Sequence, residues 1–72
     1  MDHTQWERIK IRLREEFGEA VFRSWMKPLA LIEVRDGVLR VGAPTRFMRD
    51  WVNTHYAEYI RALTISEGWP IA

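Results

Sequence analysis

The sequence predicts an α/β domain of the α+β type, in which helices pack on one face of a small antiparallel sheet. Apolar residues recur at helical spacing in two segments near the N-terminus and in one longer segment near the C-terminus. Two runs of branched aliphatic residues lie between them and meet at an Asp-Gly pair. Elements of this kind form a two-layer domain, so we expect the order α-α-β-β-α. With 72 residues, 47% of them hydrophobic, we expect one domain over residues 1–72.

The first helix is expected over residues 4–17. Its apolar residues fall three or four positions apart on one face, in the order Trp6, Ile9, Leu13 and Phe17. Thr4 and Glu7 form a capping-box pattern ahead of this series, and Gly18 supplies a stop. The sequence therefore marks both ends of the helix.

The second helix is short, over residues 19–26, because Pro28 disfavours a helical conformation at the residue before it. Two strands are expected over residues 29–35 and 38–43. They are joined by Asp36-Gly37, a pair typical of a type I′ hairpin turn. In the first strand Ile32 and Val34 alternate with charged residues, so we expect both on the buried face.

The third helix is the longest and is expected to run without a break to about Ile65, with Thr45 as its cap. Gly68-Trp69-Pro70 ends it. Two strands alone form a marginal sheet. Either a short third strand follows Ile65, or helix packing carries most of the stability.

The large aromatic residues divide into two groups. Trp25 and Trp51 are assigned to the core, since aromatic residues at helical spacing are usually buried there. Trp6 and Phe47 lie on the first turns of their helices, where a small core covers side chains less easily. For these two, a place at the core edge and a place as an exposed anchor both stay open. An exposed aromatic side chain ringed by charge is typical of an interface hot spot.

The sequence shows no recognisable reaction centre, and we expect no enzyme activity, no cofactor and no metal. His55 and Glu58 are three apart on one helical face, but a catalytic zinc site needs three protein ligands. The four glycines are isolated, which argues against a glycine-rich phosphate loop. The chain has no cysteine, no secretory signal pattern and no apolar run near the roughly 20 residues of a membrane span. We therefore expect a cytoplasmic protein without membrane contact.

The charge argues against a dedicated nucleic-acid binder. The chain has eleven Lys and Arg residues and ten Asp and Glu residues, which gives a net charge of +1. We therefore expect nucleic-acid binding by this chain alone to be weak or absent. Arg46 and Arg49 flank Phe47, either as a solvated face or as a docking patch for an acidic or aromatic partner. The rival function is a weak single-stranded nucleic-acid-binding domain, in which Arg46, Arg49 and Arg61 hold phosphates beside stacked bases.

Two motifs resemble those of a known family. They are Phe22-x-x-Trp25-x-Lys27-Pro28-Leu29 and Ala43-Pro44-x-x-Phe47-x-x-Asp50-Trp51-Val52, in this order and at this separation. Over residues 6–63 the chain resembles the N-terminal domain of the bacterial chromosomal replication initiator DnaA. The resemblance implies a KH-like fold without the glycine clamp, and a protein-interaction platform in replication initiation. In that family ATP and origin DNA are handled by later domains.

The resemblance also implies which residues bind partners. Trp6 corresponds to an aromatic residue at a self-association surface, which implies a weak homodimer. Phe47 corresponds to the aromatic residue that contacts the replicative helicase, and Thr45 and Arg46 fall where initiator regulators dock. Arg49 completes the expected partner-binding set. The chain is expected to be either part of an initiator or a stand-alone regulator or dimerisation domain.

Overall fold

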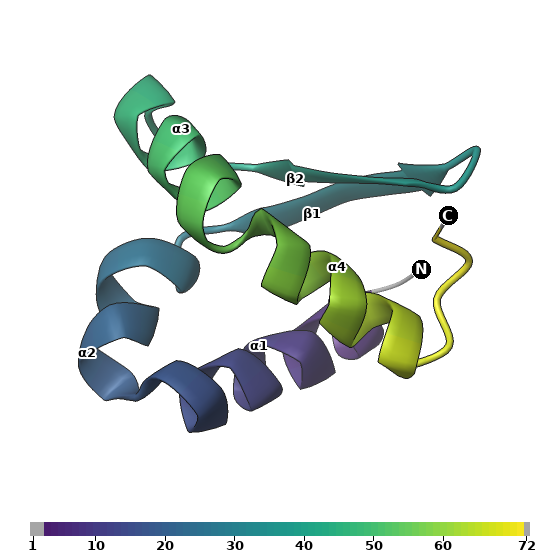
Figure 1. Cartoon of the computed structure of the whole chain (residues 1–72), viewed down its shortest axis with the longest axis horizontal. Coiled ribbons are helices and arrows are strands. Elements are labelled where there is room, and N and C mark those ends of the chain that lie inside the picture. Colours follow the sequence, from purple (N-terminus) through teal and green to yellow (C-terminus); the bar gives the residue numbers. More distant parts are fainter. Residues whose placement is uncertain (1–2, 72) are drawn as a thin grey trace.

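The computed structural model describes residues 3–71, and its elements fall into the predicted classes. Five helical segments and two strands follow in the order α1 (His3–Phe17), α2 (Glu19–Val21), η1 (Phe22–Met26), β1 (Ala30–Arg35), β2 (Val38–Gly42), α3 (Arg46–His55) and α4 (Ala57–Ser66). In Figure 1 the antiparallel β1–β2 hairpin forms the upper layer, and α1 and α4 lie below it. The α+β fold class is confirmed.

The core is built mainly from the helices. On α1 the side chains of Trp6, Ile9 and Leu13 are buried, as the apolar stripe predicts. They pack with buried residues of the other segments: Phe22, Met26, Leu29, Val52, Ile60, Leu63 and Trp69. Thr64 is also fully buried, and its hydroxyl donates a 2.8 Å hydrogen bond to the carbonyl oxygen of Arg61. This buried polar group is therefore satisfied within its own helix.

The segment between α1 and the hairpin forms the predicted short helix. Gly18 has a φ of 86°, which glycine adopts without steric cost, and it ends α1 as expected. α2 then runs directly into η1, a π-helical turn in which the N–H of Lys27 donates to the carbonyl of Phe22 at 2.8 Å. The predicted start of α1 is wrong in one respect. Thr4 lies inside a helix that already includes His3, so Thr4 does not cap it.

The hairpin turn agrees with its sequence signal. Asp36 and Gly37 have φ angles of 53° and 76°, the two positive values that a type I′ turn requires. Leu39 and Val41 of β2 are partly buried against the core. The turn therefore brings the aliphatic residues of both strands over the helices.

The first strand departs from simple alternation. Its register shifts between Leu31 and Glu33, which leaves Ile32 as an extra residue in a β-bulge. Leu31 and Val34 pack against the core, whereas Ile32 is 59% exposed. The prediction that Ile32 shares the buried face with Val34 is therefore wrong, because one inserted residue reverses which side chains face inward.

The predicted third helix is in fact two helices. Tyr56, with φ of −127° and ψ of −11°, separates α3 from α4. Its N–H still donates to Val52 at 2.8 Å and its carbonyl still accepts from Ile60 at 2.9 Å, so both of its backbone groups stay paired. α3 packs on η1, while α4 packs on α1. The expectation of an unbroken helix is wrong because the two halves follow partners that run in different directions.

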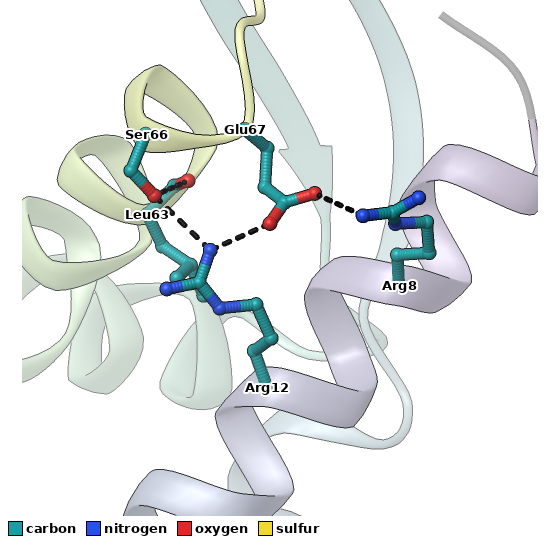
Figure 2. A network of polar contacts seen from close by, with 5 residues as sticks. All are labelled: Arg8, Arg12, Leu63, Ser66 and Glu67. Carbon is teal, nitrogen blue, oxygen red and sulfur yellow. Dashed lines mark hydrogen bonds and ion pairs between the residues drawn. The ribbon is translucent and has the colours of Figure 1, made fainter.

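Within residues 3–71 no strand follows α4, so the third strand left open above does not form there. Gly68 turns the chain back, and Trp69 enters the core with 5% of its surface exposed. Figure 2 shows the polar network beside this turn. The carboxylate of Glu67 accepts from Arg12 at 2.6 Å and pairs with Arg8 at 3.2 Å. The network thus ties the end of α4 to α1.

Candidate interaction surface

Four aromatic rings come together on η1 and α3, and we call them the aromatic surface: Trp25, Phe47, Trp51 and His55. The rings of Trp25 and Trp51 are stacked, with centroids 4.9 Å apart and planes 17° apart. Phe47 lies 6.0 Å from Trp25 and 6.3 Å from Trp51, and His55 lies 4.2 Å from Trp51. These separations are typical of aromatic rings in contact. The four rings therefore form one continuous surface.

Helical periodicity explains why α3 contributes three of these rings. Phe47, Trp51 and His55 follow one another at intervals of four residues, which advances the stripe by only about 40° per step. Val52 lies on a neighbouring stripe and is buried in the core. The side chain of Thr45 accepts a 3.1 Å hydrogen bond from the N–H of Met48, which confirms the predicted cap. Thr45 therefore fixes the start of the helix that carries the surface.

Exposure separates the members of this surface. Phe47 is 67% exposed, which resolves its open assignment in favour of an exposed side chain. Trp51 is 36% exposed, so its assignment to the core is wrong: stacking on Trp25 covers one face of the indole and leaves the rest open. Trp25 is partly buried against the core. The spacing of Phe47, Trp51 and His55 beside a second apolar stripe was the sequence signal for this arrangement.

Two exposed cations are close in sequence to rings of the aromatic surface. Arg46 directly precedes Phe47, and Lys27 comes two residues after Trp25; both are exposed. Neither cation forms an ion pair with another residue of the described range. Arg49, by contrast, pairs with the carboxylate of Asp50 at 3.1 Å. The two arginines of the expected docking patch therefore differ, since only Arg49 has an ion-pair partner within residues 3–71.

Trp6 lies apart from this surface. Its side chain is 3% exposed, and its ring lies 6.4 Å from that of Trp69. The ammonium of Lys10 sits 5.9 Å from the indole centroid on another side. The indole Nε1 is buried and finds no hydrogen-bond partner within residues 3–71. Of the two interpretations left open for Trp6, burial is the correct one, and its implied role in self-association stays a prediction.

A groove of about 550 Å³ lies between β2 and the α3–α4 pair. Its walls include Leu39, Val41, Val52 and Ile60. Arg49 and Arg61 also line it, and both have an acid within ion-pair distance: Asp50 at 3.1 Å and Glu58 at 3.8 Å. Arg46 and the aromatic rings are absent from this lining. Of the expected phosphate track, Arg49 and Arg61 therefore line this groove, and Arg46 does not.

The titratable groups with shifted pKa values lie outside the aromatic surface. Burial lowers the pKa of Lys10, and the nearby negative charge of Glu7 partly offsets this. Burial raises the pKa of Tyr59, and the Glu16 carboxylate raises it further. Among residues 3–71 no three His, Cys, Asp or Glu side chains are arranged to hold a metal ion. In the same range, every helix is too short or too polar to cross a membrane.

Comparison with known proteins identifies relatives of this chain. The family model described as DnaA N-terminal domain matches residues 3–65. The chromosomal replication initiator protein DnaA of Rhodopseudomonas palustris strain BisB5 is 40% identical over 60 residues, which cover 83% of this chain and 13% of that protein. The DnaA protein of Nitrobacter hamburgensis is 37% identical over 62 residues, covering 86% of this chain and 13% of the relative. The chain thus spans a small part of these relatives. No solved structure matches it.

Proposed function

The chain belongs to the DnaA N-terminal domain family, and from this membership we propose that it is one non-catalytic domain that binds proteins during the initiation of bacterial chromosome replication. Its proposed partners are the replicative helicase, regulators of the initiator and a second copy of the domain. Membership of the family supports a role in replication initiation. The aromatic surface supports the proposal that the domain acts by docking to other proteins.

The exposure of Phe47 carries this proposal. Its ring is 67% exposed although it touches the Trp25–Trp51 stack, so the fold holds a large apolar side chain in solvent. Covering such a side chain is favourable by about 25 cal/mol for each Å² of apolar area removed from water. The stack supports the ring from one side, which limits the ordering that binding requires. A partner side chain can therefore gain affinity without a change of fold.

The test is binding of the purified replicative helicase to the immobilised chain. Phe47→Ala is expected to weaken binding by about 30-fold or more, because a hot-spot aromatic residue contributes about 2 kcal/mol or more. The matched control is Ile11→Ala, which removes a side chain that is 53% exposed on α1, away from the aromatic surface. The control should bind like the parent. Equal losses in the two variants, or none in either, would refute docking through Phe47.

A single-stranded nucleic acid is the second candidate ligand, because bases can stack on the Trp25–Trp51 pair and on Phe47. Its weakness is electrostatic, since Arg49 and Arg61 already pair with acids. Binding through phosphates weakens steeply as salt is added. An oligothymidylate affinity that stays constant between 50 and 200 mM salt, on the order of the range in which phosphate contacts are lost, would eliminate this candidate.

Self-association through Trp6 is the remaining part of the proposal. The indole is 3% exposed and its ring lies 6.4 Å from that of Trp69, so a partner could reach it only after neighbouring groups, such as the C-terminal turn, move away. Sedimentation of Trp69→Ala and the parent tests this directly. If the turn limits access to Trp6, the variant should form more dimer at equal concentration, provided that circular dichroism shows it folded. Dimer formation that is unchanged would exclude Trp6 as the contact.

A further inference from the structure

We infer that the open edge of β2 binds an extended segment of a partner protein, which adds to the hairpin as a third strand and places apolar, uncharged side chains in the groove beside β2. This second interaction surface goes beyond the proposed docking through Phe47. The rings of the aromatic surface are absent from the groove lining within residues 3–71. The two surfaces can therefore be tested separately.

The sheet leaves β2 with one unpaired edge. In the described residues the sheet has two strands, so β1 lies along one side of β2 and no strand lies along the other (Figure 1). Arg35 and Val38 flank the two-residue turn and exchange backbone hydrogen bonds, and such pairs alternate with pairs that do not. Arg40 belongs to the next hydrogen-bonded pair. The N–H and C=O groups of Leu39 and Val41 therefore point away from β1.

These backbone groups have no other protein partner in the described part of the chain. Neither Leu39 nor Val41 forms a backbone hydrogen bond with a residue outside the hairpin. The helices pack closely on one another, and within residues 3–71 none of them packs closely along β2. An open edge of this kind is a template for an added strand, because each free N–H and C=O can pair with an extended backbone.

The two strands of the hairpin differ in how well they can accept a third strand. β1 carries the bulge at Ile32, which interrupts regular pairing and is one of the ways in which proteins protect a sheet edge. β2 has no proline, and its side chains that face the core, Leu39 and Val41, carry no charge. Strand addition is therefore favoured along β2.

The groove determines which side chains the added strand needs. Its volume is about 550 Å³, and its walls include Leu39, Val41, Val52 and Ile60 but, among the described residues, none of β1. The groove therefore lies on the open side of β2. Residues directly opposite each other in paired strands point to the same face, so every second side chain of the added strand would enter the groove. Apolar side chains fit there, because they remove apolar walls from water.

The charges at the groove favour an uncharged occupant. Arg49 pairs with Asp50 at 3.1 Å, and Arg61 lies 3.8 Å from Glu58. The lining residues thus include two cations and two acids, so neither an acidic nor a basic segment finds a complementary net charge. A phosphate backbone finds no excess of positive charge in this lining either.

A second copy of this chain fits the same edge less well. In the antiparallel register that pairs Leu39 of each copy with Val41 of the other, Arg40 would lie directly opposite Arg40 of the second copy. Like charges in that position destabilise a pair of strands. Glu33 lies 3.3 Å from Arg40, which reduces this repulsion without removing it, because exposed ion pairs are weak. A segment of a different protein avoids the repulsion.

Selection of displayed peptides tests the inference without assuming a partner. A random library of peptides of about ten residues, enough for one strand, is selected on the immobilised parent. Enriched peptides should have uncharged apolar residues at alternate positions. Because strand hydrogen bonds alternate, methylating one alternating set of their amide nitrogens should lower the affinity about tenfold or more, and methylating the other set should not. Equal effects of the two sets, charges at the alternate positions, or the absence of enriched peptides would overturn the inference.

Hydrogen exchange of the backbone amides locates the added strand. In the free chain the hairpin should protect the amides of Val38 and Arg40, whereas those of Leu39 and Val41 should exchange fast. A bound peptide should slow exchange at Leu39 and Val41 by about tenfold or more, and to a larger extent than at Val38 and Arg40. Unchanged exchange at Leu39 and Val41 contradicts the inference.

Protection of these two amides in the free chain would also overturn it. Protection that rises with the concentration of the chain identifies a second copy as the occupant. Protection that does not depend on concentration identifies another part of the same chain.

Asn53→Arg and Thr54→Arg form a matched pair of variants on α3. Both residues are exposed, but only Asn53 lines the groove. Asn53→Arg should lower the affinity for the enriched peptides about tenfold, because it places a charge where apolar side chains bind. Thr54→Arg and Phe47→Ala should both bind like the parent. Equal losses in the two Arg variants overturn the inference. A loss confined to Phe47→Ala also overturns it, and docking through the aromatic surface then stands.

Discussion

Replacing Glu67 by Gln tests whether the polar network of Figure 2 stabilises the fold. The side chain of Glu67 is 16% exposed, and its carboxylate contacts Arg12 at 2.6 Å and Arg8 at 3.2 Å. Arg12 also donates to the hydroxyl of Ser66 at 3.1 Å, and that hydroxyl donates to the carbonyl of Leu63 at 2.8 Å. Glutamine keeps the shape of the side chain but removes its charge. Any loss therefore measures the charge on Glu67.

The structure places the expected loss of stability in Glu67→Gln between two limits. Hydrogen bonds to charged groups contribute about 1.5–3 kcal/mol, whereas exposed ion pairs contribute about 0–1 kcal/mol. Glu67 is largely covered, but the side chains of Arg8 and Arg12 are 69% and 45% exposed. We therefore expect Glu67→Gln to lower the free energy of unfolding by about 1–2 kcal/mol. For a domain of this size each kcal/mol lowers Tm by about 4–8 °C, so the variant should melt about 4–16 °C below the parent.

Thermal unfolding followed by circular dichroism measures this difference. Glu58→Gln is the matched control, because Glu58 is 92% exposed and its contact with Arg61 is 3.8 Å long. The control should stay within about 0.5 kcal/mol of the parent. If Glu67→Gln melts no lower than Glu58→Gln, the reasoning is refuted, and the burial of Trp69 alone holds the C-terminal turn against α1.

Three further substitutions follow from the fold. Trp6→Ala should lower the free energy of unfolding by about 3–5 kcal/mol, which is comparable with the whole stability of so small a domain. Circular dichroism should then show a chain that is largely unfolded at about 25 °C. A variant that melts at the same temperature as the parent would contradict the burial of Trp6. Thr45→Ala should lower the free energy of unfolding, measured in urea, by about 1 kcal/mol, whereas Thr45→Ser should keep most of the stability of the parent. Equal free energies of unfolding for the two variants would show that the Thr45 cap does not stabilise the helix. Ile32→Thr should keep the free energy of unfolding within about 0.5 kcal/mol of the parent, whereas Val34→Thr should lower it by more. A larger loss for Ile32→Thr than for Val34→Thr would mean that the bulge does not turn Ile32 outward.

The sequence predicts most of the fold because the relevant signals are local. The buried stripe of α1 follows from spacing, and the hairpin turn follows from the positive φ angles that Asp36 and Gly37 tolerate. Gly18 and Thr45 mark helix ends through backbone geometry and a single side-chain hydrogen bond. Each of these features depends on residues a few positions apart.

The features that sequence reasoning missed depend on distant contacts. Tyr56 carries no local signal for a helix break, and the break follows from the packing of α3 on η1 and of α4 on α1. The bulge at Ile32 is likewise set by pairing with the second strand. A third strand after Ile65 stays possible from the sequence because a two-stranded sheet is marginal, but within residues 3–71 none forms, and Trp69 packs into the helical core instead.

The candidate site was predicted in part. Phe47 was recognised as a side chain near a helix start that a small core covers poorly, and it is exposed. The assignment of Trp51 to the core is wrong because aromatic residues at helical spacing are usually buried, whereas spacing alone does not say which of two apolar stripes faces inward. For Trp6 the sequence leaves both assignments open because it lies on the first turn of its helix, and its contact with Trp69, more than sixty residues further along the chain, has no local signal.

The four tryptophans occur as two separate pairs, and this gives the domain two built-in optical probes. Trp6 and Trp69 are buried beside each other, whereas Trp25 and Trp51 are stacked where solvent reaches them. Emission from the first pair is shielded from a dissolved quencher until the chain unfolds. The dissolved quencher reaches the second pair in the folded chain and lowers its emission, and a bound partner that covers this pair protects its emission from the quencher. One unlabelled sample therefore reports unfolding and docking as two distinct fluorescence signals.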